Sequence, residues 1–229
     1  MLPRMNPLEA LQLQLRLEGK EIVDGDLLRQ VEAVPGEDMP LMIIAQLADG
    51  QVVTCYDESL EPDLRLGLTK SSHTIRFPKI DPLLEFLNTR KILFEVGHYK
   101  TNLFPQNFTA ENGHPVKSYS RQHPLVETFG FGNLAEYVYG IEQDEKIVSA
   151  CVSAGEDERC GEAWVYTDPR YRRHGFARQV VSVWAQDMNA AGKIPFYSHK
   201  IENLASANLA RRLSLEPIFE EIVVSSLHS

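Results

Sequence analysis

Residues 165–177 carry the residue types of this chain that are best suited to binding an anion. They read Val-Tyr-Thr-Asp-Pro-Arg-Tyr-Arg-Arg-His-Gly-Phe-Ala, a pattern that predicts a strand end, a loop and the start of a helix. The first N–H groups of a helix lack intrahelical partners and lie at the positive end of its dipole. Such a helix start can bind a phosphate or diphosphate, and the small residues Gly175 and Ala177 leave room for it.

The charge of this segment differs from that of the whole chain. The 229 residues include 32 acidic and 23 basic side chains, a formal net charge of -9, so binding to nucleic acid or to an anionic membrane is not expected. No acid lies between Asp168 and Asp187, whereas four arginines fall there: Arg170, Arg172, Arg173 and Arg178. The alternative is a solvated, arginine-rich loop. The arginines together with the glycine and the helix start favour an anion site.

The elements around this segment predict an α/β domain. Sequence periodicity predicts strands over 136–143, 146–154 and 162–167, a helix from Phe176 to about Ala191, a strand over 194–198, a helix over 204–213 and a last strand over 217–225. Three hairpin-linked strands followed by two crossovers indicate a mixed, mostly antiparallel sheet flanked by helices.

Three motifs in this domain resemble the Gcn5-related N-acetyltransferase (GNAT) superfamily. They are Arg172-x-x-Gly175-x-Ala177 after a strand, which looks like its acyl-coenzyme A signature, and Pro195-Phe196-Tyr197-Ser198 and Asn203-x-x-Ser206-x-x-Leu209, which resemble its fifth strand and following helix. The resemblance covers about 135–225 and fits best an uncharacterised bacterial subgroup with an N-terminal extension. It implies a GNAT-like fold and an acyl-CoA-dependent N-acyltransferase, with acetyl-CoA as co-substrate and no metal.

By this resemblance, coenzyme A lies where the fourth and fifth strands of the domain separate. The edge of 165–167 pairs with the pantetheine amides, the helix start holds the diphosphate, and Asn203 hydrogen-bonds the pantetheine arm. Asn203 is equally suited to cap the helix that follows it. The implied cofactor-binding residues are Val165, Tyr166, Thr167, Arg172, Arg173, His174, Gly175, Phe176, Ala177, Arg178, Asn203 and Ser206.

Acetylation of an amine needs a base that removes a proton and a donor that stabilises the thioester oxygen. Glu162 resembles the strand glutamate that is the base in several family members, although a carboxylate that simply faces water is an equal alternative. The Val165 N–H is the expected oxyanion donor. Many members carry a tyrosine that protonates the leaving thiolate, but this chain has Ala210 there. The acid must then come from elsewhere: Tyr166, Tyr197, Ser198 and His199 are available, with Tyr166 and Ser198 as the catalytic candidates.

Two functions fit these residues. One is direct transfer of an acetyl group from acetyl-CoA to an amine of a small molecule or peptide in a ternary complex. The alternative, which Ala210 favours, is a non-catalytic or degenerate CoA-binding module with a regulatory or structural role. The acceptor is unknown, and the acid excess suits a cationic amine. With no apolar run of roughly 20 residues and no signal-peptide pattern, a cytoplasmic location is expected. The expected assembly is a monomer or a homodimer.

The first half predicts a different kind of region, and we expect domains at 1–95 (α+β, role unknown), 96–134 (connecting or substrate-lining) and 135–229 (GNAT-like). An apolar run over 41–48, then Asp49-Gly50 and a β-branched run over 51–56, predicts a hairpin, which could also recruit a partner. A helix is expected over 81–89 and a strand over 91–97. Asn6 and Pro7 predict a helix start, whereas the alternating leucines over 11–17 fit a strand. Residues 99–131 show no period.

The remaining chemistry-bearing residues predict structural roles. Cys55, Cys151 and Cys160 are odd in number and lack CxxC spacing, so reduced thiols are expected. Trp164 and Trp184 are expected to be core anchors. The seven histidines are dispersed, without the paired spacing of a metal site.

Overall fold

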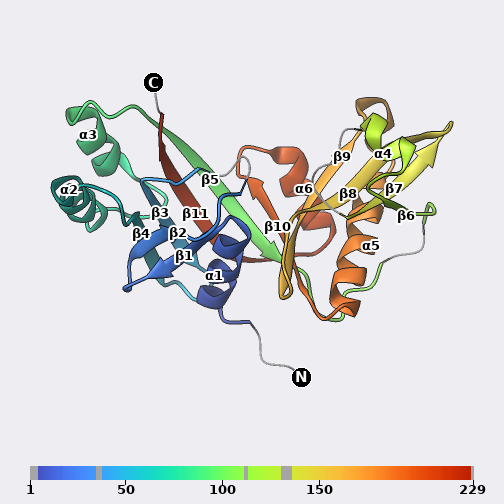
Figure 1. Ribbon diagram of the computed structural model, residues 1–229, viewed down its shortest axis with the longest axis horizontal. Coiled ribbons are helices and arrows are strands. Elements are labelled where there is room, and N and C mark those ends of the chain that lie inside the picture. The colour runs from blue at the N-terminus through green and yellow to red at the C-terminus, as the bar shows by residue number, and fades with distance from the viewer. Residues whose placement is uncertain (1–4, 35–37, 111–112, 130–135, 228–229) are drawn as a thin grey trace. The chain divides into compact units, whose positions relative to one another are not determined.

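The computed structural model describes residues 5–34, 38–110, 113–129 and 136–227 (Figure 1). Within the chain two units pack internally, Met1–Lys100 with Ile218–Ser229 as the first and Thr101–Pro217 as the second. The three-part domain division at 1–95, 96–134 and 135–229 stays a prediction.

The first unit is an antiparallel-rich sheet with three helices. Its elements are α1 (Pro7–Leu17), β1 (Lys20–Val23), β2 (Leu27–Gln30), β3 (Met42–Leu47), β4 (Val52–Asp57), α2 (Pro62–Ser72), α3 (Asp81–Thr89), most of β5 (Phe94–Leu103) and most of β11 (Glu216–Ser226). Hydrogen-bonded neighbours follow the order β1-β2-β4-β3-β11-β5. The hairpin predicted at Asp49-Gly50 is confirmed, because β3 and β4 pair antiparallel from Met42↔Tyr56 to Gln46↔Val52.

The opening segment is a helix, as the cap residue predicted. The Asn6 side chain accepts a hydrogen bond from the Leu8 N–H at 2.9 Å, and Pro7 occupies the first turn. Leu11, Leu13 and Leu15 are all buried. The strand alternative was wrong, because a helix buried over much of its circumference also carries apolar residues at alternating positions.

Three elements of the first unit went unpredicted, namely β1, β2 and α2, and one strand was misplaced. The strand expected over 91–97 begins at Phe94 and continues to Leu103, into the stretch that shows no period. The sequence of α2 offers one signal of a helix start, Pro62 in the first turn. Leu68 is the one buried residue of this helix, so the helix lacks the apolar periodicity by which a helix is predicted.

The second unit contains most of the elements that the sequence predicted. Its elements are the end of β5, β6 (Lys117–Ser120), α4 (Pro124–Phe129), β7 (Tyr137–Gln143), β8 (Lys146–Glu156), β9 (Cys160–Thr167), a 3-10 turn (Pro169–Tyr171), α5 (Phe176–Ala190), β10 (Ile194–Lys200) and α6 (Leu204–Arg212). The strands and helices from β7 onwards were predicted, whereas the end of β5, β6 and α4 lie in the stretch that shows no period. The strand order is β5-β10-β9-β8-β7-β6. Strands β6 to β9 pair antiparallel, and β10 is parallel to β9. The mixed, mostly antiparallel sheet flanked by helices is confirmed.

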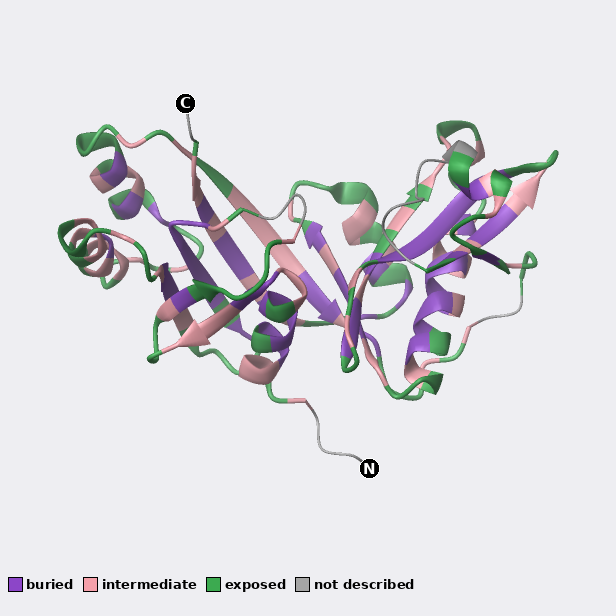
Figure 2. Cartoon of the chain, viewed as in Figure 1, coloured by how far each residue is buried: buried purple, intermediate pink, exposed green. Residues whose placement is uncertain are grey.

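Helices cover both faces of the second unit's sheet. On one face, Val180, Trp184 and Met188 of α5 and Leu213 after α6 pack with Cys151 of β8. On the other, Val126 of α4 packs with residues of β7 and β8, namely Val138, Ile147, Ala150 and Val152. Figure 2 shows the resulting buried stretch along β8 and the inner side of α5. The sheet is therefore held between α5 and α6 on one side and α4 on the other.

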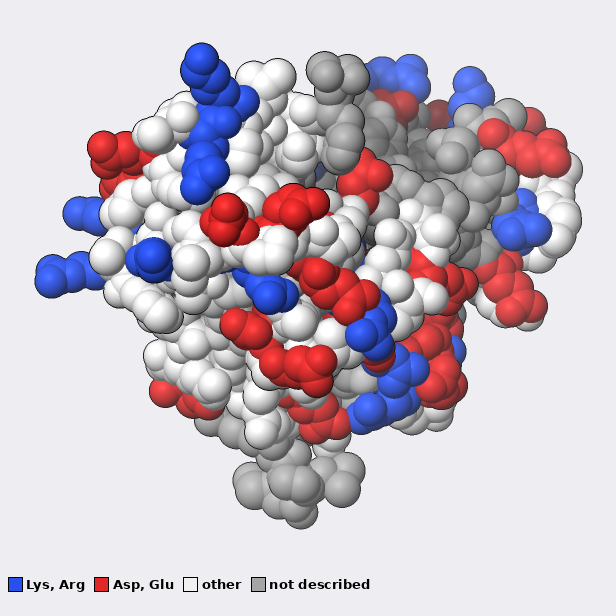
Figure 3. Space-filling view, turned by 60° about the vertical axis from the view of Figure 1, so that its left-hand side comes forward, with Lys and Arg blue, Asp and Glu red and all other residues white. Residues whose placement is uncertain are grey.

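Charged side chains of both signs occur on the surface. On the face drawn in Figure 3, acidic and basic groups are interspersed. In the described part of the chain, none of the helices is long and apolar enough to cross a membrane.

Candidate functional site

Strands β9 and β10 are joined at their starts and then separate. Their parallel register runs from Ile194↔Cys160 through Pro195↔Gly161 to Phe196↔Glu162. Both strands continue beyond these pairs, β9 to Thr167 and β10 to Lys200. From Ala163 onwards, the edge of β9 that faces β10 has no register with that strand. An extended ligand can pair with backbone groups there as a further strand would.

A tight loop connects the open end of β9 to α5. Asp168 caps the 3-10 turn by accepting from the Arg170 N–H at 2.9 Å. The chain then turns through two residues of left-handed conformation, Arg173 at φ 70° and Gly175 at φ 82°, and Gly175 is the N-cap of α5. A non-glycine residue at positive φ is strained, and such strain concentrates at functional sites. The loop presents the first N–H groups of α5 at its mouth.

The space beside Gly175 is open. A Cβ built on this residue would meet no atom within 4 Å, and the same is true of Gly192, which follows α5 at φ 75°. The glycine at the helix start is thus needed for its backbone conformation and leaves room next to the helix amides. An oxyanion that binds to helix amides needs such open space.

The arginines of the loop are not equivalent. Arg170 forms an ion pair with Asp168 at 2.8 Å, and the Nε of Arg172 donates to the Thr167 carbonyl at 3.2 Å. The hydrogen bond from Arg170 lowers the pKa of Asp168 to about 2. Arg172, Arg173 and His174 are exposed, and Arg178 is half-buried in the first turn of α5. The positive charge of this window therefore lies around the helix start, as the sequence predicted.

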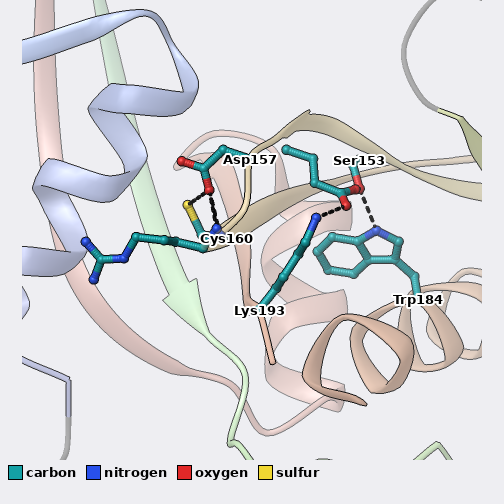
Figure 4. Close-up of polar contacts among 7 residues, drawn as sticks. Ser153, Asp157, Cys160, Trp184 and Lys193 are labelled. Carbon is teal, nitrogen blue, oxygen red and sulfur yellow. Dashed lines mark hydrogen bonds and ion pairs between the residues drawn. The ribbon is translucent and has the colours of Figure 1, made fainter. Parts of the chain in front are cut away.

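The joined ends of β8, β9 and β10 are fixed by side-chain hydrogen bonds (Figure 4). The indole Nε1 of Trp184 on α5 donates to the Ser153 hydroxyl at 3.0 Å. Lys193, just before β10, donates to Glu156 at 2.6 Å. Asp157 accepts from the Cys160 N–H at 2.8 Å and so closes the β8–β9 turn. These contacts hold the strands together immediately before Glu162, where the separation begins.

Segments 105–110 and 113–116 lie along α5 and are bound by its side-chain amides. The contacts run from the end of the helix to its start: Asn189 Nδ2 to the Pro105 carbonyl at 3.0 Å, Ala110 N–H to Gln186 Oε1 at 2.8 Å, and His114 N–H to Gln179 Oε1 at 3.1 Å. At the helix start, the ring of His114 packs on Phe176 with centroids 4.8 Å apart. This strap (105–110 and 113–116) brings a histidine to the candidate anion site that sequence reasoning missed.

One face of β9 carries Glu162, Trp164 and Tyr166. Glu162 is half-buried, whereas Trp164 and Tyr166 expose 44% and 42% of their surface. The expectation of a core role for Trp164 was wrong, and Trp184 with 1% exposure is the core tryptophan. The alternation of β9 explains the difference, because Ala163 and Val165 take the inward face that packs toward α5.

A GNAT acetyltransferase family model matches residues 118–221 of this chain. That range holds the separating strands, the arginine loop and the start of α5, so the match coincides with the geometry just described. Over these residues the chain is similar to the GNAT superfamily. Sequence motifs and fold agree on this point, and the resemblance inferred from Arg172, Gly175 and Ala177 is confirmed.

Solved structures show the same fold at low sequence identity. A GNAT-family acetyltransferase from Colwellia psychrerythraea is 10% identical with a TM-score of 0.52, over 98% of each chain. A GCN5-related N-acetyltransferase from Kribbella flavida is 12% identical with a TM-score of 0.52, over 99% of this chain and 98% of that one. A putative GNAT-family acetyltransferase from Novosphingobium aromaticivorans is 14% identical with a TM-score of 0.50. The match covers 58% of the present chain and 66% of the Novosphingobium protein, which is just under two thirds of that protein's length. No curated protein matches the chain.

The site brings together two of the predicted groups of residues, and a third lies at the start of α6. Val165 to Thr167 and Arg172 to Arg178 meet where β9 ends and α5 begins. Asn203 caps α6 by accepting from the Ser206 N–H at 3.1 Å, which confirms the capping alternative. Ser198 of β10 lies within hydrogen-bond distance of Thr101, with the hydroxyl oxygens 2.9 Å apart. Its role in catalysis stays a prediction.

The position of the missing tyrosine is part of the GNAT domain's core. Ala210 on α6 is 5% exposed and belongs to the same hydrophobic cluster as Tyr197 of β10. Burial raises the pKa of Tyr197 to about 12, and a hydrogen bond with Ser206 opposes that shift. Tyr197 therefore stays protonated at neutral pH, on the sheet face that α6 covers.

Proposed function

We propose that the protein is an acyl-CoA-dependent N-acetyltransferase, which moves an acetyl group from acetyl-CoA to an amine by direct transfer in a ternary complex. The observation that supports this most is the edge of β9 beyond Glu162, where the register with β10 ends, leading into the Gly175 turn and the start of α5. An extended ligand ending in a diphosphate matches that sequence of groups. Peptide-like amides suit the strand edge, and the phosphates suit the helix amides.

The residues of the loop would bind the coenzyme through complementary charge and open space. The amides from Arg173 to Ala177 would hold the diphosphate, and the exposed guanidinium groups of Arg172 and Arg173 would add charge-assisted hydrogen bonds. Backbone groups of Val165 and Thr167 would pair with the pantetheine arm, and Asn203 and Ser206 would line its far side. The absence of a neighbour within 4 Å of a Cβ at Gly175 is consistent with this fit.

Glu162 is the proposed base, because it lies where the strands separate, on the same strand as the oxyanion donor proposed at the Val165 N–H. The carboxylate would take the proton that the amine loses as its nitrogen bonds to the acetyl carbon. The resulting tetrahedral intermediate would collapse in the same ternary complex as its carbon–sulfur bond breaks, and the thiolate would take a proton from Tyr166, from Ser198 or from water. A free thiol has a pKa of about 8.5, so a thiolate can leave without a dedicated acid.

The matched pair Gly175 and Gly192 tests the coenzyme site. Both have positive φ and open space for a side chain, so Gly175→Leu and Gly192→Leu should lower the thermal midpoint by similar amounts. Gly175→Leu alone should weaken acetyl-CoA binding in calorimetric titration, by at least about tenfold, because its side chain would occupy the diphosphate position. Equal affinity in the two variants, or no saturable binding by the folded wild type, would contradict the proposal.

Ala210, at the position where many family members carry a tyrosine acid, supports a second candidate, a CoA-binding module without turnover. An assay of thioester hydrolysis and of acetyl transfer to an amine panel separates the two. Turnover that falls in Glu162→Gln while acetyl-CoA affinity is kept supports the enzyme. Tight binding without turnover in the wild type supports the module. We further propose a cationic amine as the acceptor, a monomer or homodimer as the assembly, and the cytoplasm as the location.

A further inference from the structure

The outer face of β9 combines a carboxylate with two exposed aromatic rings. Side chains of a strand alternate between faces, so Glu162, Trp164 and Tyr166 point to the same side. Across the ladder, Trp164 lies opposite Val152 and Tyr166 opposite Ala150, and both partners belong to the cluster packed under α4. The three residues, called here the β9 face, thus lie on the side of the sheet away from α5 and α6.

The exposure of Trp164 and Tyr166 contrasts with the burial of their neighbours on β8. The residues of β8 that face them, Ala150 and Val152, are fully buried, whereas the two rings expose more than two fifths of their surface. Leaving two large rings partly in water forfeits burial energy. Such a patch is typical of a binding surface, and its residue types indicate which class of ligand it would bind.

The chemistry that suits this surface is a cation. The face of an indole or phenol ring attracts ammonium groups, and the effect adds to the charge of a nearby carboxylate. A strand rises about 3.3 Å per residue, so side chains two residues apart are roughly 7 Å apart along β9. Two such steps separate Glu162 from Tyr166, which leaves room for a ligand with two amino groups. Strand β9 itself, from Cys160 to Thr167, contains no lysine or arginine.

We propose that the β9 face selects an acceptor that carries a second ammonium group besides the amine to be acetylated. The reacting amine lies at Glu162, and the second ammonium group lies over the ring of Trp164, with Tyr166 as the adjoining wall. This inference rests on the proposed acetyl transfer, since it names the acceptor class of the same site. It assigns Trp164 a role in acceptor specificity and none in binding coenzyme A.

A matched pair of amines tests this assignment. Putrescine has two ammonium groups, and pentylamine has a methyl group in place of one of them. The wild type should acetylate putrescine with a kcat/KM about fivefold or more above that for pentylamine, the size expected for one ammonium–indole contact. Trp164→Leu should remove this preference without changing acetyl-CoA affinity. Tyr137→Leu, at a residue of β7 that is 51% exposed, is the matched surface control and should keep the preference.

Fluorescence tests the same site without any transfer reaction. The chain has two tryptophans, and Trp184 is 1% exposed, so quenching that is lost in Trp164→Phe reports on Trp164. Putrescine should quench this emission saturably and pentylamine should not. Equal responses to both amines, or a preference that survives in Trp164→Leu, would overturn the inference even if acetyl-CoA binds. Absence of acetyl-CoA binding with selective quenching would instead reject the proposed function and keep the cation site.

Discussion

At the scale of single residues, the arginines of the loop between β9 and α5 differ in how far other groups of the protein already bind them. Sequence reasoning predicted the cluster of arginines but could not say which are already engaged, because that depends on the turn. Arg170 is held by Asp168 and Arg172 by the Thr167 carbonyl, while Arg173 adopts a left-handed backbone. The side chain most constrained by an internal ion pair, Arg170, is therefore the least suited of these to bind a ligand.

The Asp168–Arg170 pair predicts a particular response to acid. Because the folded-state pKa of Asp168 is lowered to about 2, the pair stabilises the fold above the usual aspartate pKa of about 3.9. That contribution is lost as the pH falls from about 4 to 2. Asp168→Asn keeps a side-chain oxygen for the cap at Arg170. Urea unfolding should show wild type above variant at pH 6, with the difference shrinking below pH 4. A difference that grows on acidification would contradict the pairing.

At the scale of elements, regular periodicity decided what could be predicted. The strands and helices after residue 136 were found within a few residues, because each has a buried face or, like β8, a continuous buried run. The strap escaped, since it is held by side chains of another element, the amides of Gln179, Gln186 and Asn189. The separation of β9 from β10 was expected from the family resemblance alone. No pattern of side chains reports where a ladder of backbone hydrogen bonds ends.

The exposure of one face of β9 could have been predicted from the sequence. Glu162, Trp164 and Tyr166 have the same parity, and the carboxylate at the first of them indicates an outward face. The core role expected for Trp164 came from residue type alone. Parity would have placed Trp164 outside the core, because neighbouring Ala163 and Val165 supply the inward positions.

The strap on α5 predicts local changes in hydrogen exchange. Gln186→Ala should speed exchange of the Ala110 amide, and Gln179→Ala that of the His114 amide, because each glutamine accepts from that N–H. Each lost hydrogen bond should cost about 1 kcal/mol of stability or less. The two variants serve as controls for one another. Identical exchange patterns in both would show that the strap is released as a whole.

At the scale of the whole molecule, the cysteines are part of the packing of both units. Cys55 lies in β4 of the first unit, Cys151 in β8 and Cys160 in β9 of the second, and all three are buried thiols. Burial raises the pKa of Cys55 to about 12 and raises that of Cys151 as well. The expectation of reduced thiols fits this placement, because a buried neutral thiol is a poor nucleophile.

The raised pKa values predict resistance to alkylation. At pH 8, an unfolded cysteine with a pKa of about 8.5 is partly thiolate, whereas Cys55 and Cys151 in the fold remain protonated. Iodoacetamide should leave both unmodified in the native protein and modify both in guanidinium chloride, as read by peptide mass spectrometry. Rapid native labelling of Cys151 would show that β8 opens, since its thiol is fully enclosed.

Strand β11 joins distant parts of the sequence within the first unit. It lies between β3 and β5 in the strand order and pairs antiparallel with β3 from Phe219↔Leu47 to Val224↔Met42. Ile222 and Val224 belong to the hydrophobic cluster of that unit, beside Leu83 of α3.

This arrangement sets an order of events during synthesis. The ribosome makes β11 only after residues 101–217, so the first unit waits with an open place between β3 and β5 while the second is translated in full. An exposed pair of strand edges is a site for wrong pairing between chains. Slow translation of residues 101–217 therefore lengthens the time during which the first unit exposes these strand edges, and the second unit completes its own part of the sheet before the first.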